Sequence, residues 1–143
     1  MTTNQSVEPT LTEFLNTWTG DDCNAKSFFQ QFHQQLAAKQ QVTLDWVSRP
    51  GISHSLRGNI AGQTEYPLFV MIDVIDDDPD SRWLSVCFYG EMIDDPDDQG
   101  DLVPGGLLGK DGHCFDLDDN DPELAAYIAA RIDQAYQHLR QRT

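Results

Sequence analysis

Basic residues are scarce in this sequence. It holds 9 Lys and Arg residues against 24 Asp and Glu residues, so its formal net charge at pH 7 is −15. A surface that binds nucleic acid or an anionic membrane must be basic, and this charge argues against both kinds of partner. Long apolar runs are also missing, since no segment reaches the ~18 apolar residues that a membrane-spanning helix needs. Residues 1–9 hold neither a basic region nor an apolar run, so we expect no secretory signal there.

Cysteines are few and form no recognisable pattern. The three, Cys23, Cys87 and Cys114, are an odd number and include no C-x-x-C pair. A disulfide framework needs paired cysteines and an oxidising compartment. We therefore expect free thiols, a buried Cys87 and a cytoplasmic location.

The composition is that of one folded domain. The chain has 143 residues, of which 39% are hydrophobic and 10% aromatic, which is enough apolar material for a core despite the charge. We expect a single α+β domain over residues 1–143, with residues 1–8 disordered. Its predicted parts are two N-terminal helices, an antiparallel meander sheet of four to five strands, and a C-terminal helix packed on one sheet face.

Three segments have the apolar period of helices. Thr10 and Glu13 form a capping box that predicts a helix over residues 9–20. Asp21 or Asp22 caps a second helix, whose predicted buried stripe is Ala25, Phe28, Phe29, Phe32 and Leu36. The third helix begins at Pro122, after the capping residue Asp121.

From Val42 the apolar period changes to two, which predicts two strands joined at residues 49–51. A loop with an odd number of residues collects the apolar side chains on one face, whereas a two-residue loop divides them. We therefore predict a three- or five-residue connection that pairs Trp46 with His54, and a positive φ at Gly51.

Two further strands follow over residues 66–75 and 82–93, with a short edge strand over residues 113–115. The strand at 66–75 is apolar on both faces, and the side chains of its second face are Phe69, Met71 and Ile75. Such a strand needs cover on both sides. Residues 102–108 or a second subunit are the candidates for that cover.

Residues 94–112 read as a long loop, acidic at first and then apolar and rich in Gly and Pro. At 19 residues it exceeds the length of about 12–15 that compact domains usually allow without a function. Its large aliphatic side chains are candidates for contact with a partner: Leu102, Val103, Leu107 and Leu108.

The familiar cofactor and metal motifs are absent, and we predict no cofactor. Asp95, Asp97 and Asp101 offer oxygen ligands for Ca²⁺, but the calcium-loop template fails because its twelfth position is Gly106 rather than Glu. The His and Cys spacings do not fit a zinc site, and no phosphate-binding glycine motif is complete.

A ligand site is conceivable around the basic residues of the second strand. Arg57 and His54, with Arg82, could form an anion pocket, or His54 could act as an acid or base. An ordinary cross-strand ion pair between Arg57 and Asp45 explains the same residues more simply. Strand alternation turns His54 and Arg57 to opposite faces, and we predict no catalytic residue.

Three functions therefore remain open. The leading interpretation is a small non-enzymatic interaction domain that binds a protein partner, or a second copy as a homodimer, through residues 94–112 and the second sheet face. The first alternative is an acidic decoy or inhibitor of a basic partner. The second is an enzyme or anion-binding site at His54 and Arg57.

Overall fold

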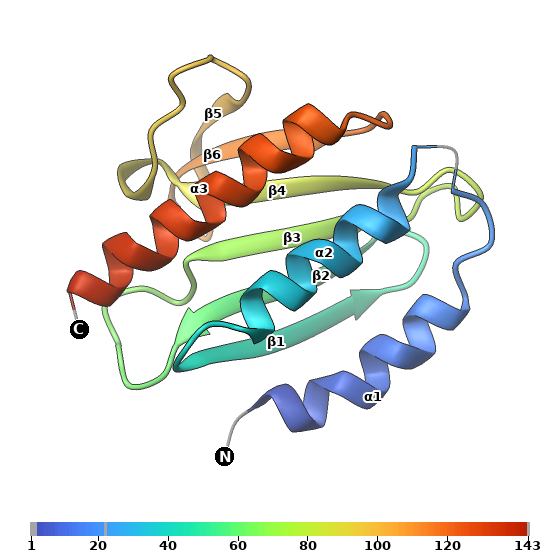
Figure 1. Ribbon diagram of the computed structural model, residues 1–143, viewed down its shortest axis with the longest axis horizontal. Coiled ribbons are helices and arrows are strands. Elements are labelled where there is room, and N and C mark those ends of the chain that lie inside the picture. Colours follow the sequence, from blue (N-terminus) through green and yellow to red (C-terminus); the bar gives the residue numbers. More distant parts are fainter. Residues whose placement is uncertain (1–2, 22, 143) are drawn as a thin grey trace.

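The chain forms two layers, a six-stranded sheet and helices that cover one of its faces (Figure 1). The structure is a computed structural model that describes residues 3–21 and 23–142, with side chains from residue 10 onward. The strands are β1 (Val42–Arg49), β2 (Ser53–Ile60), β3 (Val70–Ile75), β4 (Trp83–Tyr89), β5 (Asp101–Leu107) and β6 (Lys110–Leu117). They are antiparallel and lie in the order β1-β2-β3-β4-β6-β5. The α+β prediction is confirmed, with six strands instead of four to five.

The helices are α1 (Thr3–Asn16), α2 (Ala25–Ala37) and α3 (Pro122–Gln141), and a 3-10 turn, η1 (Gly90–Met92), follows β4. Figure 1 shows α2 and α3 lying across the sheet and α1 beside β1. The predicted apolar stripe of α2 is buried, and so are the core residues of α3. Within the described residues, none of the helices is long and apolar enough to cross a membrane.

The helix starts were predicted with mixed success. Asp121 caps α3 as expected, because its carboxylate accepts a hydrogen bond from the Leu124 N–H at 3.1 Å. The predicted capping box is wrong, since α1 begins at Thr3 and Thr10 lies inside it. Residues 3–8, which we expected to be disordered, belong to α1, and residues 1–2 lie outside the described residues.

The start of α2 also differs from the prediction. Its capping residue is Asn24, which has a left-handed backbone with φ +60°. Asp21 still contributes, because its carboxylate accepts a hydrogen bond from the Lys26 N–H at 3.1 Å. The alternative cap, Asp22, lies outside the described residues.

The β1–β2 hairpin has the predicted odd loop. Arg49 pairs with Ser53, which leaves three residues in the turn, and Gly51 has φ +81°. The pairing of Trp46 with His54 is wrong by two residues, because Trp46 lies opposite Leu56 and His54 opposite Ser48. A shift of two keeps every side chain on its predicted face.

The prediction that Phe69 lies on the second face with Met71 and Ile75 is wrong. Phe69 is covered by a helix and not by residues 102–108 or a second subunit. Phe69 precedes β3, and its ring lies 5.7 Å from that of Tyr136 in α3. Met71 and Ile75 do lie on the opposite face of the sheet, as predicted. We call this the open face, because the helices lie on the other side. Its side chains include Asp45, Val47, Ser55, Arg57, Met71, Asp73, Ile75, Trp83, Ser85, Cys87, Cys114 and Asp116.

The prediction of a loop over residues 94–112 is partly wrong. Only its first part is irregular, whereas β5 and most of the rest form a hairpin with β6 that extends the sheet. The short edge strand expected at 113–115 is the centre of β6, which pairs with β4 on its other side. The ladder breaks between Val103 and Leu107, so the residues around Pro104 bulge from the edge.

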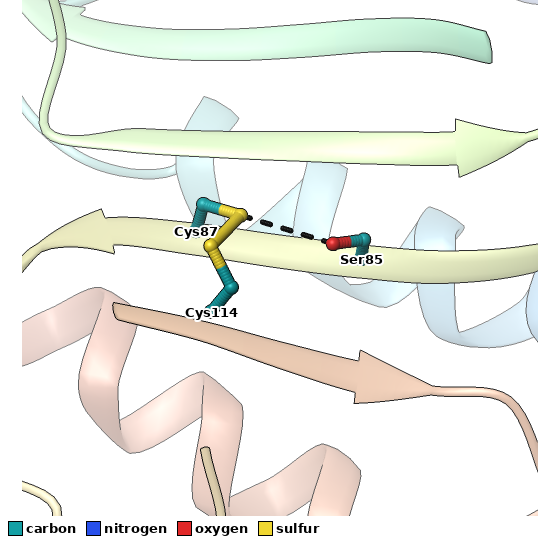
Figure 2. The surroundings of a disulfide bond; sticks show 3 residues. All are labelled: Ser85, Cys87 and Cys114. Atoms are coloured by element: carbon teal, nitrogen blue, oxygen red, sulfur yellow. Dashed lines mark hydrogen bonds between the residues drawn. A yellow bond between two sulfur atoms is a disulfide. The ribbon is translucent and has the colours of Figure 1, made fainter. Parts of the chain in front are cut away.

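The prediction of free thiols is wrong for two of the three cysteines. Cys87 of β4 and Cys114 of β6 lie directly opposite each other and form a disulfide (Figure 2). Figure 2 also shows that this disulfide lies on the side of β4 away from the helices, with Ser85 beside it. The bond could not be predicted, because the two residues are 27 positions apart and become neighbours only through strand pairing. The cysteine argument for a reducing compartment therefore no longer holds.

Candidate functional site

A chain of polar side chains runs from an exposed serine to a buried carboxylate where α1 meets the end of β1. His54 is 5% exposed, and both of its ring nitrogens are engaged. Ser48 Oγ lies 2.5 Å from His54 Nδ1, and Asp76 Oδ2 lies 2.7 Å from His54 Nε2. We call these three residues the Ser48 triad. Ser, His and Asp in this order are the arrangement of a nucleophile, a base and the acid that orients the base.

Local structure explains why these distant residues meet. Ser48 and His54 are directly opposed in the β1–β2 ladder and point to the helix side. Asp76 follows β3 and stays attached to the sheet, because its backbone N–H donates to the Ile52 carbonyl at 2.9 Å. The β1–β2 ladder positions Ser48 and His54, and the hydrogen bond to Ile52 positions Asp76 beside them.

Arg82 completes the cluster from the other side of Asp76. Its Nε donates a hydrogen bond to Asp76 Oδ1 at 2.6 Å, within a buried ion pair. Its guanidinium carbon lies 4.9 Å from the ring centre of Phe14 and 5.4 Å from that of Trp18. Two donors here, Arg82 Nη1 and Trp18 Nε1, are buried without a hydrogen-bond partner. Such orphan donors mark a place where an acceptor is needed.

The charge state of Asp76 is set by its neighbours. Burial alone would raise its pKa, but the hydrogen bonds from Arg82 and His54 outweigh burial and hold the pKa below its usual range. Asp76 is therefore a carboxylate at neutral pH. The His54 ring lies between aromatic side chains, 4.4 Å from Phe14 and 6.0 Å from Trp46 between ring centres.

The structure divides the predicted ligand site between two faces. His54 and Arg82 do come together, through Asp76, on the helix side. Arg57 lies on the open face, as strand alternation predicted, directly across from Asp45. Its Nε donates to Ser55 Oγ at 3.2 Å rather than forming the expected ion pair with Asp45.

Arg57 nevertheless lines a hollow. A depression of about 350 Å³ on the open face is bordered by Asp45, Arg57 and Asn59 of the first two strands and by Leu108 from the β5–β6 turn. The hairpin thus brings one predicted contact residue beside a predicted ligand residue. Asp73, on the adjoining strand, has a carboxylate oxygen buried without a hydrogen-bond partner.

The predicted contact residues of the hairpin separate into two kinds. Leu102 and Leu108 are more than half exposed, at 60% and 54%, and Val103 is also exposed. Leu107 is 3% exposed and belongs to the core, so its assignment to a contact surface is wrong. Leu108 and Gly109 form the two-residue turn, and both have a positive φ, of +52° and +89°.

The acidic segment before β5 is organised by protein donors. Asp95 accepts hydrogen bonds from the Gln99 and Gly100 N–H groups, from Tyr127 and from His113. Although burial raises the pKa of Asp95, these bonds outweigh it and hold the pKa far below its usual range. Across residues 3–21 and 23–142, no group of three or more His, Cys, Asp or Glu residues is placed to hold a metal ion. The Asp95, Asp97 and Asp101 alternative thus gains no support.

A second hollow, of about 590 Å³, lies beside η1. Tyr89, Glu91, Lys110 and His113 line it, together with Leu102. The Tyr66 hydroxyl donates a hydrogen bond to the Glu91 carboxylate, which raises the pKa of Tyr66 to about 12. Two of its polar side chains are thus already paired with residues outside the lining, Glu91 with Tyr66 and His113 with Asp95.

Sequence reasoning missed Ser48 and Asp76. Ser53 and Ser55, the serines next to His54 in sequence, lie on the other face of the sheet, and the serine that does reach His54 comes from the partner strand. A correct hairpin register, with Ser48 opposite His54, would have revealed the pair. Cys23 is a free thiol, as predicted, and its pKa is raised by burial first and then by Asp21.

No protein-family model matches this chain, and neither the curated proteins nor the solved structures include a match. Function therefore has to be argued from the site geometry alone.

Proposed function

We propose that this chain is a protein-binding domain that docks a basic partner on its open face and on the tip of the β5–β6 hairpin. The observation that carries the proposal is the hollow in which Leu108 reaches the open face beside Asp45 and Arg57. A depression that combines an exposed aliphatic side chain with charged groups is typical of the anchor point of a protein interface.

The chemistry of the open face supports this reading. Helices lie on the opposite side of the sheet, so its half-buried apolar residues Val47, Ile75 and Trp83 have no helix above them. Exposed carboxylates lie on the same face, at Asp45, Asp101 and Asp116. An apolar centre with a charged rim is the usual anatomy of an interface.

Charge selects the partner. The chain carries −15, so two copies repel each other, whereas a basic surface is attracted. The acids are dense enough to influence one another, because the pKa of Asp116 is raised first by burial and then by Asp118 and Asp101. A basic partner relieves this repulsion and a second copy increases it.

Leu108 is the proposed anchor residue. It holds a left-handed backbone that costs a non-glycine residue about 1 kcal/mol or more, and it points an aliphatic side chain at solvent. Asn would satisfy the same turn better. A residue that folding alone disfavours is a reasonable candidate for a binding role.

The proposal is tested with Leu108→Asn and a matched control, Ile52→Asn. Ile52 is also a large exposed aliphatic residue, at 61%, but it lies in the β1–β2 turn. A displayed library of random linear peptides is selected against the wild-type chain, and affinities of the selected peptides are measured at 50 and 300 mM NaCl. We expect basic peptides with an apolar residue, weakened about tenfold by Leu108→Asn and unaffected by Ile52→Asn.

Hydrogen exchange locates the contact in the same experiment. Protection by a bound peptide is expected over residues 43–45, 57–59 and 107–110, and it should diminish at high salt. Selection of neutral or acidic peptides, or equal losses in the two variants, would overturn the proposal. Formation of a homodimer at micromolar concentration, with the peptides competing against it, would replace the basic partner by a second copy.

A further inference from the structure

The Ser48 triad lies at the edge of the sheet, outside the docking surface proposed above. Ser48 is exposed, whereas His54 and Asp76 are 5% and 6% exposed. An accessible hydroxyl backed by a buried base and a buried acid is the order of exposure that nucleophilic catalysis needs. A structural hydrogen-bond chain has no need for an exposed end.

The hydrogen bonds fix which nitrogen of the imidazole can accept a proton. Arg82 keeps Asp76 ionised, and a carboxylate can only accept hydrogen bonds, so His54 Nε2 must donate to it. In the neutral imidazole Nδ1 is then an acceptor, and the Ser48 hydroxyl must donate to it at 2.5 Å. This is the direction of proton transfer that activates a serine.

The backbone of Ser48 offers a donor for the charge that develops on a carbonyl oxygen. Gln41 and Ala61 are hydrogen-bonded at the base of the hairpin, so the odd-numbered residues of β1 bond to β2. The N–H of Ser48, an even-numbered residue, therefore points away from β2. β1 is the outer strand of the sheet, so this N–H points to the side of β1 where no strand pairs with it and where α1 lies. A nucleophile's own N–H serves as an oxyanion donor in known acyl-transfer sites.

We propose that Ser48 is a nucleophile for acyl transfer from small esters, with His54 as its general base and Asp76 as the positioning residue. Ser48 Oγ attacks the ester carbonyl carbon while its proton passes to His54 Nδ1. The C–O bond to the alcohol then breaks, and that proton leaves with the alcohol. Water hydrolyses the acyl-Ser48 by the same route, returning a carboxylic acid and the free hydroxyl. No oxidant, reductant or metal is needed.

The substrate class follows from the surroundings. Ser48 is an exposed residue one position before the end of β1, which leaves room for a small acyl group at its hydroxyl. Arg82 Nη1 and Trp18 Nε1 are orphan donors in the adjoining cluster and disfavour a purely apolar ligand there. Short-chain esters are therefore the substrates to test first.

The test uses a fluorophosphonate, which phosphonylates activated serines with loss of fluoride, and detects the adduct by intact mass and peptide mapping. We expect one adduct on Ser48, which is absent in Ser48→Ala. Ser81, which is exposed but has no hydrogen bond from its hydroxyl to an imidazole, is the control. Labelling of Ser48 should exceed that of Ser81 about 100-fold, and Ser81→Ala should leave it unchanged.

One further readout separates activation from mere accessibility: para-nitrophenyl acetate should give a burst of para-nitrophenol that Ser48→Ala abolishes. Equal labelling of the two serines, the absence of this burst, or no adduct on the folded chain would each overturn the proposal. Those outcomes leave the docking proposal intact, because Leu108 and the open face play no part in this reaction.

Discussion

Leu108 combines an unfavourable backbone with an exposed side chain, and this makes an unusual prediction possible. Leu108→Asn should stabilise the domain by about 1 kcal/mol, because Asn tolerates positive φ and forms the preferred Asn-Gly turn with Gly109. Little burial is lost, since Leu108 is 54% exposed. Urea unfolding measures the change in the free energy of unfolding.

The neighbouring Leu107 is the control for that measurement. It is 3% exposed, so Leu107→Asn places an amide in the core and should cost roughly 2–5 kcal/mol. Similar free energies for the two variants would mean that the hairpin tip does not hold the two leucines in different environments. Changing both at once would hide this contrast.

Among the secondary-structure elements, β4 and β6 are joined both by a ladder and by the Cys87–Cys114 disulfide. The bond closes a loop of 27 residues. A cross-link of that length restricts the unfolded chain and so raises the free energy of unfolding by roughly 3–4 kcal/mol. We expect reduction by a dithiol, or the paired change to Ser, to lower the melting temperature. Cys23→Ser should leave the response to the dithiol unchanged, because Cys23 is a free thiol.

The elements that the sequence predicted well are those whose period survives in the fold. The apolar stripe of α2 and the capped start of α3 are local sequence patterns, and tertiary packing leaves both unchanged. The odd loop around Gly51 was predictable because a loop of the wrong parity would have divided the apolar side chains of the two strands between opposite faces. The exact register was not, since a shift of two residues leaves the faces unchanged.

β5 escaped prediction because its residues carry almost no alternation. Asp101 to Gly106 are all exposed, and Pro104 and Gly105 are typical of loops. The edge of the sheet tolerates them because the ladder bulges there. The Cys87–Cys114 bond escaped for the related reason that it depends on which strands become neighbours.

The Ser48 triad shows the same division. His54 was identified as a candidate from its residue type, but Ser48 and Asp76 are separated by 28 positions, and only strand pairing and a turn bring them to one imidazole. Arg57 was assigned to the same site on chemical grounds. Because side chains alternate along β2, Arg57 lies on the other face of the sheet from His54, where it lines a hollow together with Leu108.

For the molecule as a whole, charge dominates the response to solution conditions. A net charge of −15 makes the folded state repel itself, so added salt should raise the free energy of unfolding. The carboxylates nevertheless respond to acid in two opposite ways. Asp73 and Asp116 have pKa values raised mainly by burial, whereas Asp76 and Asp95 have pKa values lowered by hydrogen bonds that outweigh burial.

The sign of each contribution follows from which state binds more protons. At Asp73 and Asp116 the folded state binds protons more tightly, so stability rises as the pH falls from neutrality towards the ordinary carboxyl pKa of about 4. At Asp76 and Asp95 the unfolded state binds them more tightly. Their contribution is complete above that pKa and is lost as the pH falls further, through the lowered values of the folded state.

Stability should therefore pass through a maximum at mildly acidic pH instead of at neutrality. Asp73→Asn tests the cause, because it removes the buried carboxylate with little change in shape. We expect this variant to be more stable than wild type at pH 7 and to gain less on acidification, as measured by urea unfolding from pH 7 to pH 3. Exposed Asp77 is the control, because Asp77→Asn makes the net charge less negative by the same amount. If Asp77→Asn flattens the profile as much as Asp73→Asn does, general repulsion and not burial of Asp73 sets the acid response.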